Sequence, residues 1–397
     1  MSTLPTRRLT WARSTAALAL TLGMAGATLA QPYTTSVLAT GLNNPRGLTF
    51  GPDGALYVTE AGISGGPGPS TLVRGAAHVY TETGSVTRIE GGLQSRVVSG
   101  LPSKYTGVTV GGGAQDIEFD ATGGAWIAIG AAIDPAVRFT DLAPNGFGLG
   151  QVRTPTGAVD VAGYETSNNP AGGPFDSNAW RLSRVADGML VTDAGGNSLL
   201  HIGSAGAFTT VAIFDSRPLG GMNPTESVPT GLAVGPDGAY YVAELTGLPY
   251  PPGAARIHRV DPGIAAPTTF ATGFTNLVDI AFGPDGSLYA LELDANGLLN
   301  PGSEGALWRI APDGSRQLVF SEGLVSPAGL AIGSDGSFYV SNFGNGNGVG
   351  QVLQITAVPE PETYALLLGG IAVLGAVVRR RKASILGDTQ GTPAASR

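Results

Sequence analysis

Four carboxylates and one amide occupy the same place in a pattern that recurs along this chain. Each copy is a short apolar run, a tight turn and a second run that alternates aromatic and β-branched residues. The second run ends at Glu60, Asp193, Glu244, Glu292 and Asn342, and at Ile129 in the least regular copy. If the copies surround an axis, these side chains form a ring at one face. Such hard oxygen ligands suit Ca²⁺, so a calcium site is one hypothesis.

A capping role and a ligand channel fit the same residues. A carboxylate that ends a strand can accept backbone N–H groups from a nearby turn, with Arg46 and Arg181 balancing the charge. Alternatively, the side chains line a polar ligand channel together with Arg46, Asp116, Arg181 and Asp279. Asp116 and Asp279 begin the corresponding runs of two copies. Local hydrogen bonding is the simpler role for these two aspartates. The sequence is compatible with a metal site, with capping and with a channel.

The other reactive residue types give no catalytic pattern. The histidines are His78, His201 and His258, which fall in strand-like runs of different copies, so we do not expect a three-histidine metal centre. The sequence contains no Gly-x-Ser-x-Gly elbow, phosphate-binding loop or His-Glu-x-x-His helix. The aspartates that precede the turn glycines are expected to be turn residues: Asp53, Asp187, Asp237, Asp285 and Asp335.

The repeat itself predicts the fold. The clearest copy spans residues 44–60, and it returns at 229–244, 277–292 and 327–342. An Asp-Gly turn between two strand-like runs is typical of a β-hairpin. The turn aspartates at 237, 285 and 335 are 48 and 50 residues apart, and a period of roughly 40–50 residues is typical of propeller blades. We therefore expect an all-β, six-bladed β-propeller over residues 31–357.

The expected blades lie at residues 41–101, from 116 onward, 178–215, 227–274, 275–324 and 325–356. We predict that a lone strand at 33–40 pairs into the last blade, which closes the ring and removes the open sheet edge. Blade one carries a Gly/Pro-rich insertion at 62–75 and a predicted hairpin at 77–89. Blade two contains an irregular stretch at 131–174, of which 150–164 is expected to form strands.

Composition excludes several classes of protein. Residues 1–30 hold three basic and no acidic residues, and 358–397 hold five basic and three acidic, which leaves 14 basic and 27 acidic residues in 31–357. That body has a net charge of −13, which argues against nucleic acid as a partner because nucleic-acid binding needs basic patches. The chain has no cysteine, so disulfides and thiolate chemistry are excluded.

Both ends of the chain have the features of targeting segments. Residues 1–30 have a charged start, an apolar stretch and a small-residue cleavage site at Ala30, as expected for a secretory signal peptide that signal peptidase removes. Near the other end, Pro359, Glu360 and Pro361 precede an apolar stretch at 364–378 and the basic residues Arg379, Arg380, Arg381 and Lys382. A basic cluster stays on the cytoplasmic side of a membrane, which would leave the propeller outside.

This C-terminal segment, residues 358–382, resembles the PEP-CTERM sorting signal. The resemblance implies export across the inner membrane, a transient membrane helix, removal of the tail by an exosortase-type enzyme, and release to the cell surface. A further tail at 383–397, which we expect to be disordered, departs from the usual pattern. A plain membrane anchor is the alternative.

The body resembles six-bladed propellers of the NHL and SMP-30 type, and within them the ScyD/ScyE family, which is encoded beside genes for the pigment scytonemin. The residues that carry this resemblance are 41–62 (GLNNPRGLTFGPDGALYVTEAG) and 191–202 (VTDAGGNSLLHI). In SMP-30 relatives, acidic and Asn side chains at the channel hold one divalent metal. One departure is Asn178-Ala179-Trp180-Arg181, which stands where other blades begin with Pro, a small residue and Gly.

Two functions follow as hypotheses. The first is a non-enzymatic exported scaffold that binds a polysaccharide, small molecule or protein partner in the envelope. The second is a calcium-dependent lactonase or hydrolase of SMP-30 type. The opening phrase also occurs in quinoprotein sugar dehydrogenases, but their chemistry needs a catalytic histidine beside basic cofactor-holding groups, and the three scattered histidines disfavour it.

Overall fold

The computed structural model describes residues 32–358, except 74, 220–223, 301 and 303, together with residue 374. The predicted signal peptide with Ala30 lies outside the described residues. So do the sorting residues Pro359, Glu360, Pro361, Arg379, Arg380 and Arg381. Within the described part of the chain, no helix has the length and apolar character needed to cross a membrane.

The described chain folds into six antiparallel blades, each with four main strands. Blade one contains β2 (Pro45–Phe50), β3 (Leu56–Glu60), β5 (Ala76–Glu90) and β6 (Leu93–Thr106). Blade two contains β7 (Thr109–Phe119), β8 (Ala125–Gly130), β9 (Gln151–Thr154) and β10 (Gly157–Asp160). Blade three contains β11 (Ala179–Val185), β12 (Gly188–Asp193), β13 (Ser198–Gly203) and β14 (Phe208–Ile213). The first two blades are continuous because β6 also pairs with β7.

The remaining blades follow the same order from inside to outside. Blade four contains β15 (Pro229–Val234), β16 (Tyr240–Glu244), β17 (Ala255–Val260) and β18 (Thr268–Phe274). Blade five contains β19 (Leu277–Phe282), β20 (Leu288–Glu292), β21 (Ala306–Ile310) and β22 (Arg316–Phe320). Blade six contains β23 (Gly329–Ile332), β24 (Phe338–Asn342) and β25 (Gly350–Ala357), with β1 (Tyr33–Leu42) as its outer strand.

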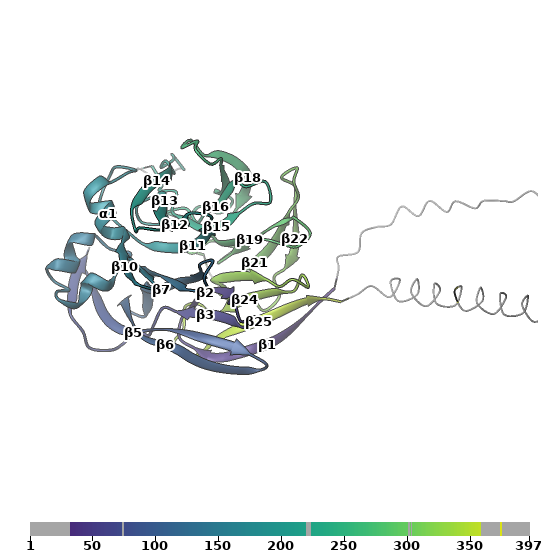
Figure 1. The fold of residues 1–397 in the computed structure, drawn as a ribbon, viewed down its shortest axis with the longest axis horizontal. Helices are drawn as coiled ribbons and strands as arrows, with labels where there is room; N and C mark the ends of the chain where they lie inside the picture. The colour runs from purple at the N-terminus through teal and green to yellow at the C-terminus, as the bar shows by residue number, and fades with distance from the viewer. Residues whose placement is uncertain are drawn as a thin grey trace, which may run out of the picture. The chain divides into compact units, whose positions relative to one another are not determined.

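The blades form a closed ring (Figure 1). The innermost strands β2, β7, β11, β15, β19 and β23 contact one another in that order, and β23 contacts β2 again. Strand β1 pairs antiparallel with β25, from Tyr33 opposite Ala357 to Leu42 opposite Gly350. The predicted six-bladed propeller and its closure by the N-terminal strand are therefore confirmed.

One local prediction was wrong, and another was confirmed only in part. Residues 77–89 do not form a hairpin but lie within the single strand β5, and β4 (Ser70–Val73) pairs with its beginning. The pairing of β5 with β6 shifts register on both sides of Gly84, so this glycine marks a bulge inside a strand, whereas the sequence suggested a turn. The strands expected at 150–164 form as β9 and β10, but residues 161–164 of that range belong to the helix α1 (Val161–Asn168).

The rest of the irregular stretch in blade two is also ordered. It contains two short 3₁₀ helices, Pro135–Phe139 and Asn145–Gly148. The side chain of Arg138 is fully buried, donates to the carbonyl of Leu149 at 2.8 Å and pairs with Asp160 at 2.7 Å. This buried arginine connects the insertion to β10 of blade two.

Candidate functional site in the central channel

One residue from each innermost strand lies at an equivalent position in the ring. The strand registers align Leu48, Ile117, Leu182, Leu232, Ile280 and Leu330, which are all buried. The residues immediately before them are Gly47, Asp116, Arg181, Gly231, Asp279 and Gly329. We call these six residues the central layer; it consists of three glycines, two aspartates and one arginine.

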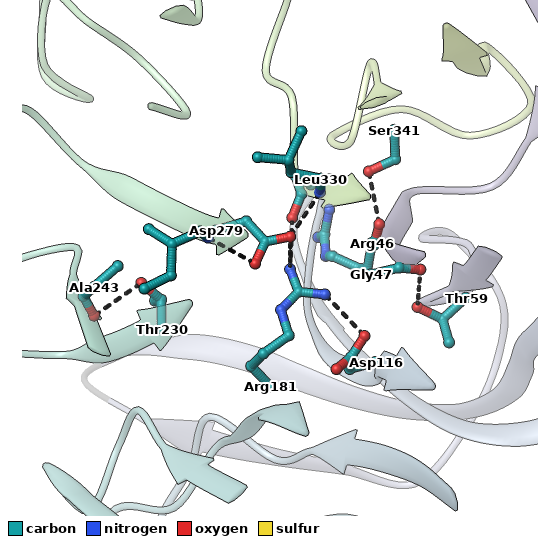
Figure 2. Close-up of polar contacts among 12 residues, drawn as sticks. Arg46, Gly47, Thr59, Asp116, Arg181, Thr230, Ala243, Asp279, Leu330 and Ser341 are labelled. Atoms are coloured by element: carbon teal, nitrogen blue, oxygen red, sulfur yellow. Dashed lines mark hydrogen bonds and ion pairs between the residues drawn. The ribbon is translucent and has the colours of Figure 1, made fainter. Parts of the chain in front are cut away.

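Arg181 joins the two aspartates of the central layer (Figure 2). Its Nη1 lies 2.8 Å from Asp116 Oδ1 and its Nη2 lies 2.7 Å from Asp279 Oδ2. All three residues are at most 6% exposed. The side chain therefore links blade three to blades two and five through buried, charge-assisted hydrogen bonds.

Both aspartates also accept hydrogen bonds from backbone N–H groups. Asp116 Oδ2 accepts from the N–H of Leu182 at 2.8 Å. Asp279 accepts from the N–H groups of Ile280 at 2.9 Å and Leu330 at 2.6 Å. Because Leu330 belongs to blade six, the central layer joins four of the six blades by side-chain contacts.

The glycines of the central layer leave the space that the ion pairs fill. A Cβ atom on Gly47 would lie 2.1 Å from Asp116 Oδ1 and 2.3 Å from Arg181 Nη1. A Cβ on Gly231 would lie 2.7 Å from the Cα of Asp279. Any larger residue at these positions would collide with the backbone or with the buried charges, so the glycines and the ion pairs depend on one another.

Burial controls the protonation of the central layer. Desolvation raises the pKa of Asp279 to about 7 and also raises the pKa of Asp116, although Arg181 lowers both. Desolvation alone would lower the pKa of Arg181, but the two aspartates raise it. Two carboxylates thus share one guanidinium, and Asp279 is the member that takes up a proton near neutral pH.

A cavity of about 360 Å³ lies directly against the central layer. All six innermost strands line it, and Asp116, Arg181 and Asp279 belong to its lining. On one side, β2, β7 and β11 contribute Thr49, Glu118 and Ser183 to the lining. On the other side, β15, β19 and β23 contribute Ala233, Ala281 and Ala331. Of the four residues predicted to line a channel, Asp116, Arg181 and Asp279 belong to this lining and Arg46 does not. A ligand-channel role for them stays a prediction.

Glu118 should make the stability of the protein depend on pH. Burial raises its pKa to about 7, so the folded state binds this proton more tightly than the unfolded state does. Stability is then expected to fall as pH rises from about 5 to about 8, by at most about 1.4 kcal/mol per pH unit. Urea unfolding at both pH values should show a smaller fall for Glu118→Gln than for the wild type. An equal fall in both proteins would contradict the assignment.

The side chains that end the second strands form hydrogen bonds or ion pairs beside their own blades; these residues are Glu60, Asp193, Glu244, Glu292 and Asn342. Four of them accept a backbone N–H from the segment that precedes their blade: Glu60 from Asn43, Asp193 from Asn178, Glu292 from Thr275 and Asn342 from Val325. Glu244 is bound instead by Arg217, Arg256 and His258. Among the residues that the structure describes, no group of three or more His, Asp or Glu side chains could hold a metal ion. The geometry matches the capping role, and calcium binding stays a prediction.

The charge partners of these carboxylates differ from the predicted ones. Arg181 binds the two aspartates of the central layer. Arg46 donates to the carbonyls of Val110, at 2.9 Å, and Gly344, and its burial lowers its pKa to about 10. It therefore acts as a buried link from blade one to blades two and six, since Ser341 of blade six also donates to the carbonyl of Arg46 at 2.6 Å.

Side chains on the third strands also bind these carboxylates, and sequence reasoning did not identify this role. Thr87 donates to Glu60 at 2.6 Å, His258 lies 3.0 Å from Glu244, and Trp308 donates to Glu292 at 2.8 Å. The three occupy equivalent positions, because each pairs with the residue two places before its carboxylate. A polar residue at this position of the third strand is the sequence feature that could have revealed the contact. Finding it requires an alignment of the third strands as well as of the first two.

Comparison with known proteins identifies one motif and several similar folds. Residues 357–382 match the PEP-CTERM protein-sorting motif, which exosortase-type enzymes recognise. The chain is therefore an exported, surface-sorted protein. A comparison with curated proteins finds no match.

Three solved structures illustrate the similar folds. A streptogramin B lyase is 13% identical with a TM-score of 0.43, over 82% of this chain and 98% of that chain. The soluble aldose sugar dehydrogenase of Escherichia coli is 14% identical with a TM-score of 0.49, over 82% and 100%. The gluconolactonase XC5397 of Xanthomonas campestris is 11% identical with a TM-score of 0.39, over 83% and 92%. These likenesses do not indicate what this chain binds or catalyses.

Proposed function

We propose that this protein is an exported propeller that binds a small ligand in its central cavity at the cell surface or in the exopolysaccharide. The observation that carries the proposal is the cavity of about 360 Å³ lined by all six innermost strands. A pre-formed concave site with a few convergent polar groups is the usual form of a ligand site. The central layer lines part of this cavity with the charged residues Asp116, Arg181 and Asp279.

The size and lining of the cavity limit the ligand. Ligand pockets span about 300–1,000 Å³, so this cavity suits a small metabolite or a terminal sugar unit better than a long chain. Thr49 and Ser183 offer hydroxyls, and Glu118 offers a carboxyl group that holds a proton near neutral pH. The alanines on the opposite side suit an apolar ring face.

The ScyD/ScyE resemblance supports a role near pigment production. It rests on residues 41–62 and 191–202, which contribute β2, β3, the end of β12 and most of β13. We propose that the chain is a scaffold or binding protein of the kind encoded beside scytonemin-type pigment genes. The alternative function, a calcium-dependent lactonase, requires that the purified protein contain stoichiometric calcium.

Native mass spectrometry of the surface-released protein tests the proposal. The full chain is expressed in a bacterium that has an exosortase, and the protein is released from the cell surface. We expect the wild type to lack its C-terminal tail and to carry an additional bound mass. The variant Ala331→Phe fills the cavity, so it should be sorted normally but lose the bound mass.

Two control variants separate sorting from binding. Pro359→Ala combined with Pro361→Ala should keep the tail and remain in the membrane fraction, whereas Thr392→Ala in the far tail should behave as wild type. An identical bound mass in the wild type and in Ala331→Phe would refute the cavity as the ligand site.

A further inference from the structure

A second cavity, of about 620 Å³, lies between blades three and four, away from the central layer. Its walls come from the end of β14 and the residues after it, from β17, and from the start of β18 with the segment before it. The residues that matter for its chemistry are Arg217, Arg256, His258, Pro267 and Thr269. We call it the arginine cavity.

A single buried carboxylate lies behind the arginine cavity. Glu244 is 0% exposed, and its carboxylate is bound by Arg217 Nη2, by Arg256 Nε at 3.2 Å and by His258 Nε2 at 3.0 Å. Burial lowers the pKa of His258 to about 4, so this imidazole is neutral at pH 7. Two guanidinium groups therefore face one carboxylate, which leaves one positive charge uncompensated within the cluster.

The repeat provides an internal comparison for this cluster. The equivalent Glu60 is paired with one arginine, Arg96, and with two hydroxyls. The equivalent Glu292 is bound by the indole of Trp308 and a backbone N–H. A strand-end carboxylate in this fold thus needs one arginine at most. The second arginine at Glu244 exceeds what burial of the carboxylate requires.

Both arginines keep donors on the cavity side. Their side chains are each 21% exposed. In the part of the chain that the structure describes, the Arg217 side chain donates only through Nη2. The Arg256 side chain donates only through Nε and through Nη1, which bonds Thr269 at 3.3 Å. A guanidinium has five N–H donors. Asp215 also lines the cavity but is exposed, so water screens its charge.

We propose that the arginine cavity binds the carboxylate of an acidic sugar, such as a uronic acid unit of an extracellular polysaccharide. The planar fork of a guanidinium matches a carboxylate in a bidentate arrangement. Pro267 supplies apolar surface for the face of a sugar ring, and Thr269 supplies a hydroxyl. The volume of the cavity accommodates a ligand of this size. This site is separate from the central cavity, and either can exist without the other.

Isothermal titration of the full chain with sodium glucuronate tests the inference. We expect glucuronate to bind and glucose to bind at least about tenfold more weakly, because glucose lacks the charged group. Arg256→Gln should weaken glucuronate binding at least about tenfold, and Arg256→Lys severalfold, since lysine keeps the charge but loses the fork. Glu244→Gln should tighten binding, because it removes the internal competitor for both arginines.

The matched control is Arg259→Gln. Arg259 lies on the same strand but pairs with the exposed Asp237 at 3.0 Å, so glucuronate affinity should stay within about twofold. Equal affinities for glucuronate and glucose would overturn the inference. So would wild-type affinity in both Arg256 variants with an unchanged melting temperature. Inorganic phosphate binding as tightly as glucuronate would replace the sugar-acid assignment by a general anion site.

Discussion

Arg181→Met is expected to lower the free energy of unfolding by about 3–5 kcal/mol at pH 8. The substitution keeps most of the apolar stem but leaves Asp116 and Asp279 buried without their shared cation. Removing one partner of a buried ion pair costs far more than the pair itself contributes, because the remaining charge is neither solvated nor paired. Urea unfolding followed by tryptophan fluorescence measures the change.

The matched control for this substitution is Arg309→Met. Arg309 pairs with Asp285 at 3.2 Å, and both side chains are more than 40% exposed. Exposed pairs contribute about 0–1 kcal/mol, so the control should stay near wild type. An equal decrease in the free energy of unfolding in the two variants would show that the buried ion pairs of Arg181 stabilise the protein no more than an exposed pair does.

Gly47→Ala is expected to destabilise the ring by about 3 kcal/mol or more, which is large for one added methyl group. The new Cβ would lie 2.1 Å from Asp116 Oδ1 and 2.3 Å from Arg181 Nη1. The ion pair would have to separate, or blade one would have to move outward. Thermal unfolding monitored by circular dichroism should show a clear decrease in melting temperature.

Gly157→Ala is the control for the added methyl group. Gly157 lies on β10, and a Cβ there would meet no atom within 4 Å. Its melting temperature should remain close to that of the wild type. A Gly47→Ala protein as stable as the Gly157→Ala protein would contradict the close packing of the central layer.

The blades could be predicted from the sequence because hairpins are local. The Asp-Gly turns at residues 53–54, 237–238 and 285–286 fix both the turn and the direction of the flanking strands within about 16 residues. In each, the aspartate accepts the N–H two residues further on, as Asp53 does from Ala55. Strand β5 could not be predicted in the same way, because a glycine marks a bulge as readily as a turn and only pairing with β6 distinguishes the two.

The central layer could be predicted only in part. The sequence showed that residues 178–181 depart from the Pro, small residue and Gly that begin other blades, and it marked Asp116 and Asp279 as candidates for the channel. It could not show that one guanidinium joins both aspartates, because the three residues come from three blades and meet only when the ring closes. The same limit applies to Glu60 and Asp193: their equivalence is readable from the repeat, but the direction of their side chains is not.

The most direct measurement is the unfolding free energy of Arg181→Met at pH 5 compared with pH 8. The central claim is that Arg181 pairs with two buried carboxyl groups, those of Asp116 and Asp279, in the middle of the ring. Without it, the pKa values of both aspartates rise further, so both carboxyl groups are protonated to a greater extent at pH 5 than at pH 8 and less buried charge remains unpaired. The loss relative to wild type should then shrink to about 1–2 kcal/mol at pH 5 from about 3–5 kcal/mol at pH 8. An equal loss at both pH values would contradict the claim.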